Sequence, residues 1–467
     1  MNRGIRSLLA VCLALLAGTG VTLGGPAADA ATLQSGTLAM AQVITRGFPA
    51  PASATLTPAV RGRQVELQVR DNGTWKTLAK DRESRQGRVS WQVDTKLSGR
   101  HLFRLRATAT TTLPTYVSPT TAVQIATLRR VSRGADAAYH PTISDDGGII
   151  AYSTESSDGS RFSDIRLWRG TTGKVEVAVS GDGDSANPAL SGDGSQLFFD
   201  SVASLDGAHA ARDIFVHPVD GIGFARLTTG NGPSGYPRTT TDGRFVVFVS
   251  WATDLVPGTV QHQQVYQLDR QSGVITRITN GDANSDFPVV SDDGGRVVFT
   301  STAADLLTTP DSDGLSDVYS SSGGTTDGLA AGDGNSFWTA ISGDGTTVAF
   351  HSDAGDLVSG DTNATRDVFV ARTGSLTRLS AAWSGAAQPA LSGDGSFISY
   401  AAFTKNGSPR LVFQSLTSTR SYAALPANAQ APEVSLTGRY VAFTSGDGLV
   451  GSDTNGVSDV YLWDRGV

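Results

Sequence analysis

One seven-residue pattern recurs along this chain and constrains its fold more than any other feature. Each copy has Pro or Thr, two further residues, Ser or Thr, and a turn ending in Gly, followed by an apolar strand. The seven copies cover residues 141–147, 188–194, 237–243, 288–294, 339–345, 389–395 and 432–438. Their first residues are spaced by 47, 49, 51, 51, 50 and 43 positions. Repeats of ~40–50 residues with four short strands each are typical of β-propeller blades.

Each repeat has room for four strands. In the fourth repeat, strand-like segments cover residues 287–291, 296–301 and 317–321, and a weaker one lies near Gly328. Asp-Gly joins the first two strands in six of the seven copies. Because Gly adopts positive φ at little cost, this dipeptide predicts a tight hairpin. We therefore expect these aspartates to be structural.

The last repeat ends with its third strand, residues 459–464, close to the end of the sequence at Val467. A blade without a fourth strand would expose a sheet edge, which proteins avoid. Residues 127–132 (TLRRVS) match the last strand of the third repeat, residues 274–279 (VITRIT). We therefore predict that residues 127–132 complete the seventh blade.

The fifth repeat shows a family resemblance most clearly. Residues 348–352 (VAFHS), 360–363 (GDTN) and 367–370 (DVFV) follow the order of its strands and loop. Over residues 127–467 the chain resembles the TolB-like, WD40-like (PD40) propeller repeats of bacterial envelope and secreted proteins. The resemblance implies a propeller with binding loops on a rigid ring. TolB itself has a different N-terminal domain and fewer blades, so its role in the Tol system is not transferred.

Residues 32–125 form a separate block. Apolar and polar residues alternate over residues 64–69, 88–93 and 101–106, and turn signals separate these segments. This pattern is typical of a small antiparallel sandwich, and the block resembles bacterial immunoglobulin-like domains. The whole chain has 39 Asp but only 5 Glu, and 32 Arg but only 5 Lys, so it has few residues for exposed helices. The expected fold is all-β: an immunoglobulin-like sandwich, then a seven-bladed β-propeller closed by an N-terminal strand.

Residues 1–30 have the pattern of a secretory signal peptide. Arg3 and Arg6 precede the apolar run 8–17, and Ala28-Asp29-Ala30 matches a cleavage site. The single cysteine, Cys12, lies inside the apolar run, so the mature chain would contain no disulfide. No later segment has the ~20 apolar residues of a membrane helix. We expect a secreted, extracellular or cell-wall-associated monomer that does not bind nucleic acid.

Acidic loops precede the third strand in three repeats. Oxygen ligands at positions 1, 3 and 7 of a tight loop resemble calcium loops, which makes calcium the one cofactor that the sequence suggests. The alternative is an Asx turn in which Asp or Asn accepts a backbone N–H of its own loop. No Glu stands at position 12, where a complete calcium loop has one. The candidate ligands are Asp311, Asp313, Asp317, Asp361, Asn363, Asp367, Asp453, Asn455 and Asp459.

Catalytic motifs are not found in the sequence: it has no GxSxG elbow, HExxH pair, P-loop or dinucleotide fingerprint. The six histidines show no ligand spacing. His140 and His351 adjoin blade anchors and could reach a rim or the channel, or simply be packed or exposed. We expect non-catalytic recognition or scaffolding, with an extracellular protein or a cell-wall polymer as partner. The alternative is a carbohydrate-active hydrolase or lyase with its catalytic site in the propeller channel.

Charge divides between the two parts of the chain. Residues 32–127 carry 13 Lys or Arg and 5 acids, whereas residues 128–467 carry 22 and 38. The net charges of +8 and −16 could draw the two parts together, or allow the sandwich to bind anionic wall polymers. The alternative is a pair of solvated surfaces without a specific partner.

Overall fold

The structure, a computed structural model, describes residues 34–466 except 156–161, 208–210, 310, 312, 364, 373 and 419–420. Every regular element within these residues is a β-strand, as expected for an all-β chain. The proposed signal peptide, residues 1–30, lies outside the described residues and stays a prediction. The described part contains no helix that is long and apolar enough to cross a bilayer.

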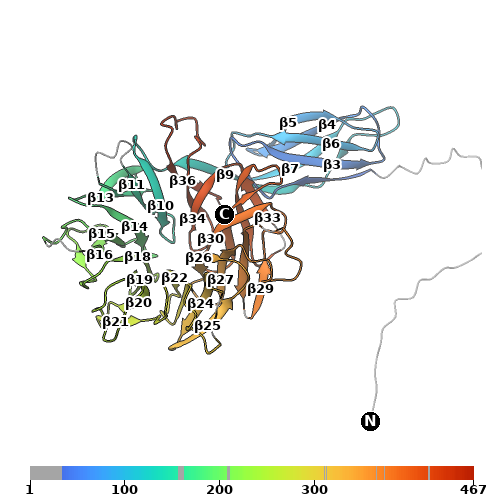
Figure 1. Cartoon of the computed structure of the whole chain (residues 1–467). Coiled ribbons are helices and arrows are strands. Elements are labelled where there is room, and N and C mark those ends of the chain that lie inside the picture. Colours follow the sequence, from blue (N-terminus) through green and yellow to red (C-terminus); the bar gives the residue numbers. More distant parts are fainter. Residues whose placement is uncertain are drawn as a thin grey trace, which may run out of the picture.

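The N-terminal part is a two-layer sandwich (Figure 1). One sheet has the strand order β1-β3-β6, and the other includes β9-β7-β4-β5, with β2 and β8 paired to β9 and β7. Leu56 and Trp91 of the first sheet pack against Leu67 and Phe103 of the second in one buried core. The strands are β1 (Ser35–Met40), β2 (Val43–Thr45), β3 (Ala50–Thr57), β4 (Gln64–Asp71), β5 (Thr74–Arg82), β6 (Arg88–Val93), β7 (Gly99–Ala107), β8 (Tyr116–Val117) and β9 (Thr121–Arg130).

The repeats fold into four-stranded antiparallel sheets arranged around a common axis, which is a β-propeller (Figure 1). The first strands are β10 (Ala137–Ile143), β14 (Ser185–Leu190), β18 (Ser234–Thr239), β22 (Ser285–Val290), β26 (Ser336–Ile341), β30 (Gly385–Leu391) and β34 (Ala429–Val434). The second strands are β11 (Ile149–Glu155), β15 (Gln196–Ser201), β19 (Phe245–Ser250), β23 (Arg296–Ser301), β27 (Thr347–Ser352), β31 (Phe397–Phe403) and β35 (Tyr440–Ser445).

The outer half of each sheet completes the blade. The third strands are β12 (Asp164–Arg169), β16 (Asp213–Pro218), β20 (Gln264–Asp269), β24 (Asp317–Ser322), β28 (Asp367–Arg372), β32 (Pro409–Ser415) and β36 (Asp459–Asp464). The fourth strands are β13 (Lys174–Val179), β17 (Ala225–Arg226), β21 (Val274–Arg277), β25 (Thr325–Ala330), β29 (Ser375–Arg378) and β33 (Ser421–Leu425).

The sheet of the last repeat takes its fourth strand from the N-terminal side of the ring. β36 pairs antiparallel with β9, with Asp464 opposite Thr127 and Tyr461 opposite Arg130. The N–H of Val131 continues this ladder by donating to the carbonyl of Val460 at 2.8 Å. The pairing predicted for residues 127–132 is therefore present. Because β9 also lies in the sandwich, next to β7, one strand belongs to both parts of the chain.

Apolar clusters between neighbouring sheets hold the ring together. One of them joins the first repeat to the last, since Tyr152 and Trp168 pack with Val460 and Leu462. Another joins the last two repeats and also includes Val43 and Ala126 from the sandwich side. Its buried members are Val43, Ala126, Ala390, Leu411, Phe413, Leu425, Ala427, Ala429, Val434, Val441, Phe443, Tyr461 and Trp463. The sandwich therefore contacts the propeller through apolar packing, in addition to the shared strand β9.

The Asp-Gly turns have the structural role predicted for them. In the fourth repeat, Asp293 accepts hydrogen bonds from the hydroxyl of Ser291 at 2.6 Å and from the N–H of Gly295 at 2.8 Å. Gly294 has a φ of 71°, and the equivalent Gly of every other repeat is also left-handed. The hydroxyl of Ser291 in turn accepts the N–H of Arg296 at 3.0 Å. The conserved spacing of the repeat thus encodes one hydrogen-bonded hairpin turn.

Interrupting the pairing of β9 with β36 should weaken the whole propeller. Val131→Pro removes the N–H that bonds to Val460, and we expect a loss of about 3 kcal/mol or more in the free energy of unfolding. Val274→Pro, at the exposed start of the edge strand β21, is the matched control and should cost far less. Urea unfolding of both variants makes the comparison. Equal losses would contradict the structural role of the shared strand.

Candidate binding site on the propeller axis

The residue before each repeat anchor has an unusual backbone conformation. All seven of these residues are non-glycine and have φ between 45° and 58°. Each lies in a β-bulge, where the pairing of the first and second strands skips two residues, as between Asp286 and Val289 in the fourth repeat. The seven residues are His140, Asn187, Tyr236, Phe287, Trp338, Gln388 and Ala431. Left-handed backbone at non-Gly residues costs about 1–3 kcal/mol each and is concentrated at functional sites.

Side chains of neighbouring repeats hold some of these bulges in place. Asp200, on β15, accepts the backbone N–H of Tyr236 at 3.0 Å and the side-chain amide of Asn187 at 2.7 Å. His351, on β27, accepts the N–H of Gln388 at 3.1 Å. Each bulge removes two residues from the sheet ladder, so these acceptors satisfy backbone groups that the ladder leaves free. The result is a set of side chains directed toward the axis.

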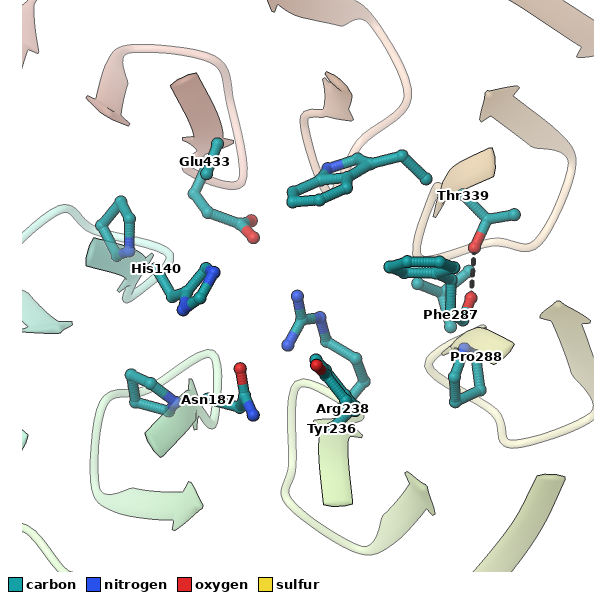
Figure 2. Close-up of a pocket in the computed structure, with 13 residues that line it drawn as sticks. His140, Asn187, Tyr236, Arg238, Phe287, Pro288, Thr339 and Glu433 are labelled. Atoms are coloured by element: carbon teal, nitrogen blue, oxygen red, sulfur yellow. Dashed lines mark hydrogen bonds between the residues drawn. The ribbon is translucent and has the colours of Figure 1, made fainter. Parts of the chain in front are cut away.

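Six of the seven bulge residues line a cavity of about 220 Å³ on the axis (Figure 2). Three consecutive repeats contribute aromatic rings to one wall. The ring centroids of Tyr236 and Phe287 are 6.4 Å apart, and those of Phe287 and Trp338 are 5.8 Å apart. Tyr236 is 50% exposed, so this aromatic wall is open to a ligand rather than sealed in the core.

The polar wall of the cavity is formed by His140, Asn187 and Glu433, which lie across from Phe287. Arg238 lies beside Tyr236, on the same strand β18. Figure 2 shows His140, Asn187, Arg238 and Glu433 directed into the hollow. Burial raises the pKa of Glu433, and the nearby guanidinium of Arg238 opposes this rise. Burial also lowers the pKa of His140, and the charge of Arg238 lowers it further. The side chain of Glu433 keeps solvent-accessible surface because it faces the cavity, although protein surrounds it.

Two further hollows adjoin this cavity. One, of about 200 Å³, continues along the axis and shares Arg238, Trp338 and Glu433. The other, of about 370 Å³, opens between the first three repeats and shares His140, Asn187 and Tyr236. The hollow of about 370 Å³ is also lined by Asp200 and Arg212, which form an ion pair. The axis therefore offers an extended cleft with one aromatic and one polar side.

The three acidic loops predicted as calcium candidates differ from one another in the structure. One carboxylate oxygen from each of Asp311, Asp313 and Asp317 lies within 4.8 Å of the others. In the fifth repeat, Arg378 lies between the acids, 2.9 Å from Asp361 and 3.1 Å from Asp367.

The seventh repeat resembles the fifth. Arg130 lies 3.4 Å from Asp453 and 2.9 Å from Asp459. The Oδ1 atom of Asn455 accepts the N–H of Val457 at 3.3 Å, and the Oδ1 atom of Asn363 accepts the N–H of Thr365 at 3.1 Å. The two asparagines thus take part in turn hydrogen bonds, as the Asx-turn alternative expected.

Of the two histidines singled out from the sequence, His140 lines the axial cavity. His351 is only 4% exposed and lies behind the bulge of Gln388. Burial lowers the pKa of His351 to about 3, with a smaller contribution from Arg366. The aromatic wall of Tyr236, Phe287 and Trp338 was not predicted. The available signal was the position just before each anchor, which varies widely in chemistry while the anchor itself is nearly constant.

No protein-family model matches this sequence, and no curated protein matches it. Among solved structures, the chain is similar to TolB from Acinetobacter baumannii, with 15% identity and a TM-score of 0.38, over 73% of this chain and 79% of that one. It is also similar to the tricorn protease, with 12% identity and a TM-score of 0.25, over 77% of this chain. That match spans about half of the tricorn protease, 47% of its length.

The buried neutral His351 should make the protein less stable in mild acid. Its folded pKa lies below the unfolded value of about 6.5, so the unfolded state binds a proton first as pH falls. Above about pH 6.5, His351 does not change the free energy of unfolding with pH. Below that pH, its titration lowers the free energy of unfolding by up to about 1.4 kcal/mol per pH unit. His351→Gln keeps an acceptor for Gln388 but removes this titration.

We expect the variant to lose less stability than the wild type between about pH 7 and pH 5, measured by urea unfolding at each pH. His262→Gln removes a histidine elsewhere and is the control. An unchanged pH dependence in His351→Gln would contradict the assignment.

Proposed function

We propose that this chain is an exported, non-catalytic recognition protein whose axial cleft binds a cell-wall polysaccharide. The observation that carries the proposal is the aromatic wall of Tyr236, Phe287 and Trp338 facing the polar wall across one cavity. Ligand sites commonly combine apolar surface with a few polar groups that fix orientation. A sugar ring has an apolar face that can stack on an aromatic ring, and hydroxyl groups that can bond to Asn187, Arg238 or Glu433.

The proposed architecture is a seven-bladed propeller that follows an immunoglobulin-like sandwich. Supporting the blade number, six sheets have four strands each, and β34-β35-β36-β9 form a seventh group of four. Supporting a ring, the first strand of the last repeat contacts that of the first repeat, β34 against β10. The two-layer sandwich of residues 34–126, antiparallel except for the pairing of β2 with β9, is consistent with an immunoglobulin-like domain.

The partner and location follow from sequence features. Export rests on the signal-peptide pattern of residues 1–30. The net charge of +8 over residues 32–127 favours an anionic polymer, because charge complementarity raises the rate of association. We propose that the protein acts as a monomer in which the sandwich and the cleft contact the same polymer. An extracellular protein is the other partner that an axial cleft of a propeller could accept.

Removing the aromatic wall should weaken binding. We expect the double variant Phe287→Ala/Trp338→Ala to bind purified cell-wall polysaccharide about tenfold less tightly, at roughly 0.5–1.5 kcal/mol per stacked ring. Alanine is compatible with this backbone, because Ala431 occupies the equivalent position with a φ of 45°. Co-sedimentation of the full mature chain with the insoluble polymer gives the affinity.

Trp251→Ala is the matched control, because Trp251 is 44% exposed but does not line the axial cavity. It should bind as the wild type does. If the double variant bound equally well, the cleft would not be the site. If no wall polymer bound at all, the extracellular protein partner would replace the polysaccharide.

A hydrolase or lyase is the second candidate, and one observation favours it. Glu433 faces the cavity with a raised pKa, as a general acid requires. Most glycosidases use two carboxylates, whereas Glu433 is the one carboxylate among the described residues that line this cavity. We therefore expect no release of reducing ends from wall polysaccharide by the wild-type protein. Release that Glu433→Gln lowers by about 100-fold or more would establish the enzyme instead.

A further inference from the structure

In three repeats, an Arg of the fourth strand neutralises the Asp that begins the third strand. The pairs are Arg226 with Asp213 at 3.2 Å, Arg378 with Asp367 at 3.1 Å, and Arg130 with Asp459 at 2.9 Å. Each guanidinium also pairs with an Asp of the preceding loop. These pairs are Arg226 with Asp206 at 2.6 Å, Arg378 with Asp361 at 2.9 Å, and Arg130 with Asp453 at 3.4 Å. One fixed cation therefore lies between two carboxylates in each of these blades.

The fourth repeat has the two carboxylates but not the Arg. Gly328 pairs with Tyr319 of the third strand, the position at which Arg378 pairs with Phe369. The same register places Arg130 opposite Tyr461 and Arg226 opposite Phe215. Gly328 thus leaves the place of the guanidinium without a side chain.

A second difference adds negative charge to the same place. Asp313 occupies the loop position that is Asn363 in the fifth repeat and Asn455 in the seventh. The fourth cluster has three carboxyl groups and no Arg. The clusters of the fifth and seventh repeats each have two carboxyl groups and one Arg. Both sequence differences therefore change the charge in the direction that a bound cation would compensate.

The geometry of the fourth cluster also indicates a missing partner. Asp317 is 1% exposed, and its Oδ2 atom has no hydrogen-bond partner. Its Oδ1 atom accepts a long bond, 3.4 Å, from the N–H of Gly332, and the carboxyl group of Asp311 lies within hydrogen-bond reach of the Asp317 carboxyl. One oxygen from each of Asp311, Asp313 and Asp317 lies within 4.8 Å of the others. Asp367 and Asp459 begin the equivalent strands, and each pairs with an Arg, whereas no ion pair joins Asp317 to a Lys or Arg among the described residues. Because burying a carboxyl group without a cationic partner is costly, this arrangement favours a ligand that supplies positive charge.

We propose that the fourth repeat binds one Ca²⁺ through Asp311, Asp313 and Asp317, in the place that an Arg side chain takes in the second, fifth and seventh repeats. Ca²⁺ prefers carboxylate oxygens and tolerates irregular geometry, with water completing its coordination. Mg²⁺ demands a near-ideal octahedron and should bind less well. The proposal is independent of the axial cleft. It assigns calcium to one of the three candidate loops and not to the loops of the fifth and seventh repeats.

Calcium titration of the full mature chain tests this site. After EDTA treatment and dialysis, we expect calorimetry with CaCl₂ to show one site per chain, with a dissociation constant of about 10⁻⁴–10⁻³ M, the range of extracellular modules. Calcium should also raise the melting temperature, because a ligand that binds only the folded state stabilises it. MgCl₂ at the same concentration should give a smaller rise.

Two variants should abolish the calcium response. Asp317→Asn replaces the buried carboxyl group with a neutral amide, so its melting temperature in EDTA should not be lower than that of the wild type. Gly328→Arg supplies the cation that the second, fifth and seventh repeats contain, and its new Cβ would lie 3.2 Å from the tip of Leu307. Asp327→Asn removes one exposed charge from the same strand β25 and, as the matched control, should keep the response.

The reciprocal change makes a site where none is proposed. Arg378→Gly combined with Asn363→Asp gives the fifth repeat the residues of the fourth, and we expect this double variant to bind a second calcium ion. No calcium response of the wild-type chain up to about 10 mM, ten times the weak end of the expected range, would overturn the proposal. An equal response in wild type and Asp317→Asn would also overturn it.

Discussion

The ladder between β9 and β36 is the contact on which the arrangement of this molecule depends. The last sheet of the propeller obtains its fourth strand from residues that precede the first repeat by sequence. A propeller distributes its core among the interfaces between neighbouring sheets, so each interface needs both of its sheets in place. Here the interface between the last and first repeats is filled by residues such as Tyr152 and Leu462. Pairing of the two distant segments brings these residues together.

The same strand connects the propeller to the sandwich. β9 pairs with β7 through residues 121–125 and with β36 through residues 127–130. Val43 on the parallel neighbour of β9 is buried in the core of the last two repeats. The net charges of the two parts suggested electrostatic attraction, but the contact that the structure shows is a continuous strand with apolar packing beside it.

The repeat produces two kinds of position with different physical demands. At the Asp-Gly turns, the same hydrogen bonds are made in six repeats, so Ser or Thr, Asp and Gly recur. At the bulges, the backbone is left-handed in all seven repeats although none of these residues is Gly. The side chains there differ widely, from Ala431 to Trp338. A strained backbone held by a rigid ring, with variable side chains, is the arrangement expected of a recognition surface.

The candidate metal loops show how much a local pattern could predict. The three Asp-x-Asp or Asp-x-Asn loops are nearly equivalent in sequence, and their Asx turns are present. Whether a loop has its own Arg depends on one residue of the fourth strand. This residue lies 11 positions after Asp317 or Asp367 in the sequence, but more than 300 positions before Asp459. Only strand pairing reveals that Gly328, Arg378 and Arg130 occupy the same place.

The sequence by itself determined the repeating strands, the hairpin turns and the segment that pairs with β36, because each is encoded by local spacing and turn chemistry. It also singled out His140 and His351 beside the anchors, but it did not decide which of the two would reach the channel. Only the tertiary structure decided that three aromatic rings form one wall of the cavity and that Arg238 and Glu433 point into it. It also decided that His351 is buried. These depend on bulges and on contacts between different repeats. Local periodicity does not predict such contacts, because they form only when the sheets pack around one axis.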